Sequence, residues 1–195
     1  MFLIISLILG LIVSVLSKGN FFRLSTLRGL WLAVIPLALN PIMKLYPEIA
    51  ILPKAVITTI SYLFIVLFII ANRRYVASAV FLGLGTISNY IVIAANSFRM
   101  PVSVKALEVY SGMTAQSVLE KRPDYFIAEN GARFLFMGDV MYIPIPMVGG
   151  FMSIGDILLA IGVFLLIVAV TTDKNALAYT EHTAHSNRTD DKHPS

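Results

Sequence analysis

The chain has 195 residues, of which 57% are hydrophobic and 13% are charged. Soluble domains usually carry about 25% charged residues, so this composition and the long charge-free runs predict an integral membrane protein. Cysteine is absent, which excludes disulfides, thiolate catalysis and cysteine-based metal sites. The net charge of +4 comes mainly from connecting segments. In a membrane protein such charge indicates orientation and contact with lipid headgroups rather than nucleic-acid binding.

Five apolar segments predict the fold: residues 2–17, 29–43, 55–72, 75–96 and 151–170. A spanning helix needs ~20 apolar residues, and ~17 are tolerated, so the last three segments qualify. The first is short, and we expect it to be a retained span, with a signal anchor as the alternative. Pro36 and the Asn40-Pro41 pair interrupt the second segment, which predicts a kinked helix or a re-entrant half-span. The predicted fold class is an all-α, polytopic membrane helix bundle.

Basic residues in two short loops predict the orientation. Lys18, Arg23 and Arg28 follow the first segment, and Arg73 and Arg74 follow the third. If all five segments span, both loops lie on one side, and the positive-inside rule makes that side the cytoplasm. The N-terminus is then outside the cell membrane and the C-terminus is inside.

The remaining residues divide into an external loop and a tail. Residues 97–150 contain two stretches rich in apolar side chains, 101–119 and 125–137, and the second holds Glu129 and Arg133 at a helical pairing distance. We expect these stretches to form an amphipathic cap on the membrane surface. Residues 171–195 are polar throughout and are expected to be a disordered cytoplasmic tail, so that residues 1–170 make up the membrane domain.

Two Gly-Asp pairs supply the candidate catalytic residues, Asp139 and Asp156. On the predicted topology both carboxylates lie at the outer face of the membrane, where a close pair shares a proton and acts as general acid and base. The alternatives are structural. Asp156, three residues after Ser153, suits the N-terminal cap of the last helix, and Asp139 suits a turn after Gly138.

Three further polar residues are candidates for binding a substrate or lipid. Asn89 lies inside an apolar segment, where bridging two helices is the alternative role. Asn96 and Arg99 follow that segment at the outer surface, and Arg99 suits a lipid phosphate, a headgroup anchor or a pairing with an aspartate. The sequence predicts no metal site and no cofactor.

Four stretches resemble an uncharacterised family of small multi-pass proteins, found mainly in Gram-positive and related bacteria. They are Arg23–Trp31, Asn96–Val102, Phe134–Val140 and Met152–Gly162. The resemblance covers most of residues 20–170 and implies no activity.

A weaker resemblance is to the lipoprotein signal peptidases, which are polytopic aspartyl proteases with two catalytic aspartates at the outer membrane surface. Asp156 opens the final helix as one of that family's aspartates does, with Ser153 where asparagine is expected. The family's other aspartate follows an asparagine in the penultimate helix. Here Asn89 matches the asparagine, but Val92 stands in place of the aspartate, so Asp139 would have to substitute from the loop.

Three functions follow from these observations. The first is an accessory or structural subunit of a larger membrane complex, since the short, interrupted segments suit helices completed by a protein partner. The second is an outward-facing hydrolase that uses Asp139 and Asp156. The third is a small transporter, in which Asn40-Pro41 breaks a helix and Asn89 lines a path. Membrane lipids are expected partners of each, and nucleic acid is not.

Overall fold

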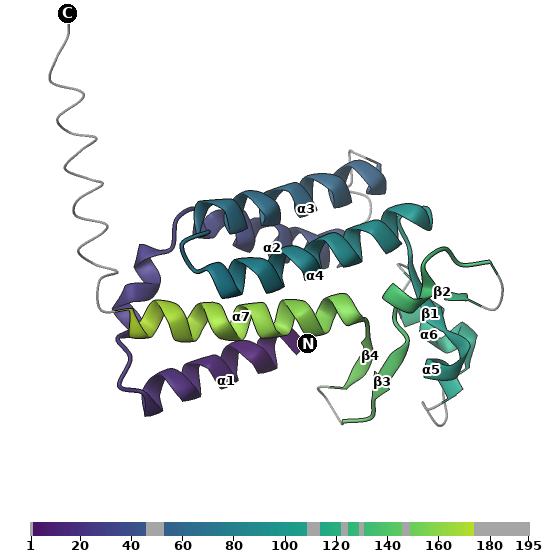
Figure 1. Cartoon of the computed structure of the whole chain (residues 1–195). Coiled ribbons are helices and arrows are strands. Elements are labelled where there is room, and N and C mark those ends of the chain that lie inside the picture. The colour runs from purple at the N-terminus through teal and green to yellow at the C-terminus, as the bar shows by residue number, and fades with distance from the viewer. Residues whose placement is uncertain are drawn as a thin grey trace, which may run out of the picture.

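A computed structural model describes residues 2–45, 53–108, 114–121, 125–128, 131–145 and 149–173. A helix occupies each of the five apolar segments (Figure 1). These helices are α1 (Phe2–Leu16), α2 (Leu30–Leu45), α3 (Lys54–Ala71), α4 (Val76–Ala95) and α7 (Ile154–Thr172). A short 3-10 helix, η1 (Phe21–Thr26), connects α1 to α2. Of the predicted tail, residues 174–195 lie outside the described residues.

Three of these helices, α3, α4 and α7, are long and apolar enough to cross a membrane, which indicates a membrane protein. Helices α1 and α2 are apolar but shorter. With 15 residues, α1 extends roughly 22 Å, less than the ~30 Å hydrocarbon core of a bilayer. Helix α2 runs as one helix through Pro36 and Pro41.

The helices pack in the spatial order α1, α7, α4, α3, α2 (Figure 1). Helix α7, the last of the described helices, therefore lies between α1 and α4. A cluster of buried apolar side chains, including Phe68, Leu82 and Leu166, joins α3, α4 and α7.

Helix α1 buries its small residues and exposes its large ones. Its buried residues are Ser6, Gly10 and Ser14, spaced four apart on one face. The Ser6 hydroxyl donates to the Ala160 carbonyl, and the Thr171 hydroxyl of α7 donates to the Ser14 oxygen at 2.8 Å. The exposed residues of α1 are leucine, isoleucine and valine side chains. This distribution is the reverse of a helix in a water-soluble protein and is typical of helices that pack through small residues in lipid.

Glycines bring α4 and α7 into close contact. A Cβ atom added at Gly85 of α4 would lie 2.7 Å from the Gly155 carbonyl oxygen of α7. One added at Gly162 would lie 2.7 Å from Leu82 Cγ, and the Ser78 hydroxyl donates to the Gly162 carbonyl at 2.8 Å. The two backbones approach closely along the length of the contact because no side chain separates them.

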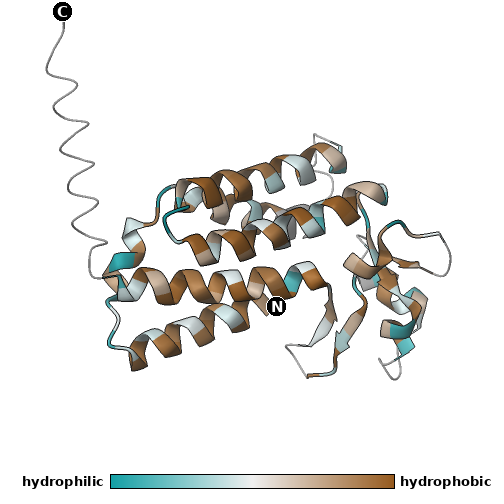
Figure 2. Ribbon diagram, in the orientation of Figure 1, coloured by the Kyte–Doolittle hydropathy of each residue, from teal (hydrophilic) through white to brown (hydrophobic). Residues whose placement is uncertain are grey.

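The two basic loops, between α1 and α2 and between α3 and α4, meet at one end of the bundle. The sequence predicts that both loops lie on the same side. The Asn72 amide donates to the Arg28 carbonyl at 2.9 Å and accepts from the Arg28 backbone N–H at 2.9 Å. Arg74 donates to the Thr26 hydroxyl at 3.0 Å, and Arg23 donates to the Thr171 carbonyl at 3.1 Å. The hydrophilic residues of this end contrast with the apolar helices in Figure 2.

The cap lies at the opposite end and contains β-strands (Figures 1 and 2). The strands are β1 (Met100–Ser103), paired in parallel with β2 (Tyr125–Ala128), and β3 (Met141–Ile143), paired antiparallel with β4 (Gly150–Met152). Short helices α5 (Val104–Glu108), α6 (Ala115–Lys121) and η3 (Leu135–Met137) complete the cap.

Within residues 125–137, Tyr125–Ala128 forms a strand and Arg133 lies in a turn. Glu129, and with it the expected helical pairing with Arg133, lies outside the described residues. The parallel partner β1 supplies backbone hydrogen bonds that a local sequence pattern does not reveal. The fold is mainly helical, with two small sheets in the cap.

Candidate functional site

Asp156 lies in the first turn of α7 as part of a capping box. Its backbone N–H donates to the Ser153 hydroxyl oxygen at 3.0 Å, and its Oδ2 accepts from the Ser153 N–H at 3.1 Å. Together these bonds satisfy two backbone donors that the start of a helix leaves without partners. The capping alternative stated for Asp156 is therefore confirmed.

Asn89 bridges α4 to this capping box. Its Nδ2 donates to Asp156 Oδ1 at 2.9 Å, and its Oδ1 accepts from the Ser153 hydroxyl at 2.9 Å. A Cβ at Gly155 would collide with Asn89 Oδ1, so the glycine of this Gly-Asp pair makes room for the bridge. Both ends of the Asn89 amide thus bond across to the start of α7, through Asp156 Oδ1 and the Ser153 hydroxyl, and the bridging role of Asn89 is confirmed.

Asp139 lies in the cap, where it is buried with 2% of its surface exposed. Its backbone forms a bridge beside β1: the Asp139 N–H donates to the Pro101 carbonyl at 2.9 Å, and the Ser103 N–H donates to the Asp139 carbonyl at 3.0 Å. A Cβ at Gly138 would lie 2.7 Å from the Pro101 carbonyl oxygen. The glycine of the first Gly-Asp pair therefore also permits a close backbone approach.

Two tyrosines, Tyr62 of α3 and Tyr90 of α4, pack against each other between these helices. The Tyr62 ring lies 5.2 Å from the Tyr90 ring, and the Tyr90 hydroxyl is 3.2 Å from the Thr59 hydroxyl. Asp139, whose backbone is bridged to β1, and Asp156, at the start of α7, both lie at the cap end of the bundle (Figure 1).

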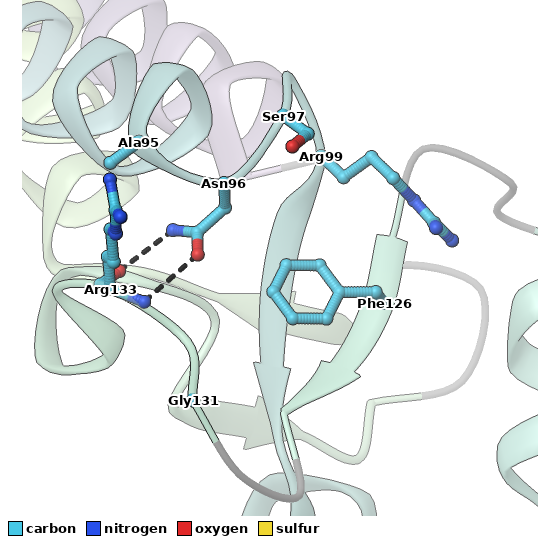
Figure 3. A pocket seen from close by; sticks show the side chains of 7 residues that line it. All are labelled: Ala95, Asn96, Ser97, Arg99, Phe126, Gly131 and Arg133. Carbon is cyan, nitrogen blue, oxygen red and sulfur yellow. Dashed lines mark hydrogen bonds between the residues drawn. The ribbon is translucent and has the colours of Figure 1, made fainter.

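The other two candidates, Asn96 and Arg99, line an open pocket where α4 meets the cap (Figure 3). Its volume is about 470 Å³, and the rest of its lining comes from Ala95, Ser97, Phe126, Gly131 and Arg133. Asn89 does not belong to this pocket, so the three proposed binding residues fall at two places. Sequence reasoning missed Phe126 and Arg133 as pocket residues, because β2 and the turn that carry them reach α4 only through the tertiary fold.

No group of three His, Asp or Glu side chains gathers in a metal-binding arrangement within the described ranges. The polar side chains at the α4–α7 contact donate and accept hydrogen bonds among themselves. This arrangement fixes the start of α7 against α4.

Comparison with known proteins gives a family and no activity. The chain matches no curated protein and no solved structure. The model of a family of unknown function, DUF5317, matches residues 24–168, and this span confirms the resemblance to an uncharacterised family. The chain belongs to the family of unknown function DUF5317.

Proposed function

We propose that this protein is an accessory or structural subunit of a larger complex in the cell membrane. The observation that carries this proposal is the outer face of α3. Within the 18-residue apolar stretch of α3, only 11% of residues are buried. The corresponding stretches of α4 and α7 have 39% and 33% of their residues buried. The exposed apolar residues of α3 form one stripe: Val56, Ile60, Leu63, Leu67 and Ile70. Their alternating spacing of four and three residues suits packing against a further helix.

The use of the polar residues within the helices also supports a structural role. Asn89, Ser153 and Asp156 direct their hydrogen bonds to one another, and Ser6 and Ser78 donate to carbonyl groups of α7. Such bonds hold helices together in lipid. Helices α1 and α2 are short and lie at the two edges of the bundle. Short membrane helices are stabilised by association with further helices, which a partner protein would supply here.

The orientation in this proposal places the cap outside the cell and the basic loops in the cytoplasm. Lys18, Arg23, Arg28, Arg73 and Arg74 all belong to the loops at one end of the bundle, and the positive-inside rule favours that end as cytoplasmic. The N-terminus then starts outside, and α7 ends inside. Exposed Phe22 and Trp31 at the basic end and Phe136 at the cap suit the two membrane interfaces.

Site-directed photo-crosslinking tests the partner-facing surface. A photoreactive amino acid at Leu63 or Leu67 of α3 is expected to give one crosslinked protein band of defined mass in intact cells. The matched control is Leu84 of α4, which is 54% exposed, similar to the 52% of Leu63. Leu84 is expected to yield lipid adducts without a protein band. Equal crosslinking patterns from α3 and α4 would contradict a partner on the α3 stripe.

A second candidate function, an outward-facing aspartate-dependent hydrolase, is favoured by the location of Asp139 and Asp156 at the cap end of the bundle. This candidate requires each carboxylate for proton transfer. Asp139→Asn and Asp156→Asn should then each abolish complementation of a deletion strain at unchanged protein levels, measured by immunoblot. Complementation by both variants at the wild-type level excludes the hydrolase and leaves the structural role.

A further inference from the structure

The pocket at the end of α4 has two arginines on its rim. Figure 3 shows Arg99 and Arg133 on different sides, with Asn96 and Phe126 between them. Both arginine residues are exposed. No carboxylate belongs to the lining formed by the described residues, so the charge of this part of the pocket is positive. Its volume of about 470 Å³ falls in the range of ~300–1,000 Å³ typical of small-molecule sites.

Local backbone structure presents Arg99 at this site. Ser97 and Phe98 both adopt left-handed φ angles, 55° and 58°, which end α4 and turn the chain into β1. The Arg99 guanidinium donates one hydrogen bond to the Tyr125 carbonyl at 2.6 Å and lies 5.9 Å from the centre of the Phe126 ring. A guanidinium has five N–H donors in a planar fork, so Arg99 retains donors for a ligand.

Asn96 fixes the backbone that carries Arg133. Its Nδ2 donates to the Arg133 carbonyl at 2.8 Å and to the Val92 carbonyl at 2.7 Å, and its Oδ1 accepts from the Arg133 N–H at 3.0 Å. Both amide hydrogens and the amide oxygen of Asn96 are therefore in use, which makes Asn96 a positioning residue. The two dashed bonds in Figure 3 show this attachment of the turn to the end of α4.

Two arginines beside an aromatic wall match one ligand chemistry. Guanidinium groups bind phosphate oxygens through paired, charge-assisted hydrogen bonds, and the Phe126 ring offers an apolar surface to a neighbouring glycerol or acyl group. The pocket lies where an apolar helix, α4, gives way to the polar cap, and the cap also exposes the side chains of Phe134 and Phe136. That is the depth at which phospholipid headgroups are found. We propose that this pocket binds an anionic phospholipid headgroup, whose negative charge Arg99 and Arg133 attract from opposite sides.

The test measures lipid binding to the purified full chain in neutral detergent by native mass spectrometry. Phosphatidylglycerol is titrated against the wild type, Arg99→Gln, Arg133→Gln and the double variant. Each single change is expected to weaken binding several-fold, and the double change ~10-fold or more, because each removes a positive charge from the pocket. Arg73→Gln is the matched control, since Arg73 is exposed at the opposite end of the bundle. This variant should bind phosphatidylglycerol as the wild type does. Arg99→Lys should retain part of the affinity.

Two further arms identify the source of the phosphate. Phosphatidylcholine, which has the same phosphodiester but no net charge, should bind at least several-fold more weakly than phosphatidylglycerol. Soluble glycerol phosphate should not displace the lipid at equal concentration. Equal binding by the double arginine variant and the wild type, with unchanged thermal stability, overturns the proposal. Displacement by glycerol phosphate at equal concentration overturns the lipid source.

Discussion

Replacing Gly85 with alanine is expected to lower the free energy of unfolding by about 2–3 kcal/mol, as overpacking of a tight contact does. The added methyl group would lie 2.7 Å from the Gly155 carbonyl oxygen and 2.8 Å from the Leu159 backbone nitrogen. Both atoms belong to the backbone of α7 and cannot move without displacing that helix. The measurement is reversible unfolding in detergent micelles, followed by circular dichroism or by steric trapping.

Gly83 provides a matched control on the same helix. A Cβ atom added there meets no atom within 4 Å. Gly83→Ala is therefore expected to be neutral or to stabilise α4 by up to about 1 kcal/mol, the difference in helix propensity between the two residues. Equal destabilisation by Gly83→Ala and Gly85→Ala would show that the close approach of α4 and α7 is wrong.

The second large effect is expected at Asn89. Asn89→Leu keeps a similar volume but leaves Asp156 Oδ1 and the Ser153 hydroxyl without their cross-helix partner. The expected loss in unfolding free energy is about 2 kcal/mol, because a hydrogen bond to a charged group contributes more than a neutral one. This exceeds the average of ~0.6 kcal/mol for polar contacts between membrane helices, which are mostly neutral pairs.

A double-mutant cycle isolates this interaction. Asp156→Ala alone removes the bond from the Ser153 N–H, whose loss costs about 1 kcal/mol, together with the bond from Asn89. Combined with Asn89→Leu, it should show a coupling energy of about 1 kcal/mol or more, since the two side chains contact each other directly. Leu84→Ala, at an exposed position of the same helix, should be additive with Asp156→Ala. Simple additivity of Asn89→Leu with Asp156→Ala would contradict the bridge.

The sequence predicts the helices well because their signal is local. Apolar runs place the central three helices within a residue or two of their observed bounds. At α7 the expected segment starts at Phe151, but Gly150–Met152 pairs with β3, and the helix begins after Ser153. The Ser153-to-Asp156 spacing is a visible capping signature, and the structure uses it to set the start of α7.

The strands and the glycine contacts could not be predicted in the same way. Strand β1 pairs with β2 more than twenty positions later, and no alternating pattern marks either four-residue segment. Gly83 and Gly85 look equivalent in the sequence, yet only Gly85 lies against α7. The partners of Asn89 depend on which face of α4 meets α7, and this is decided by tertiary packing.

The placement of α7 between α1 and α4 has a consequence for how the protein is made. Of the described helices, α1 leaves the ribosome before the others, and the helix that receives its Ser6, Gly10 and Ser14 face leaves after them. Until α7 has been synthesised, the face of α1 that carries these three small residues therefore has no packing partner in the membrane. Assembly of the bundle is completed only when the final helix inserts beside it. A chain that stops before residue 154 lacks the helix that joins the two halves, so late truncations should be cleared by proteolysis rather than accumulate as shorter bundles.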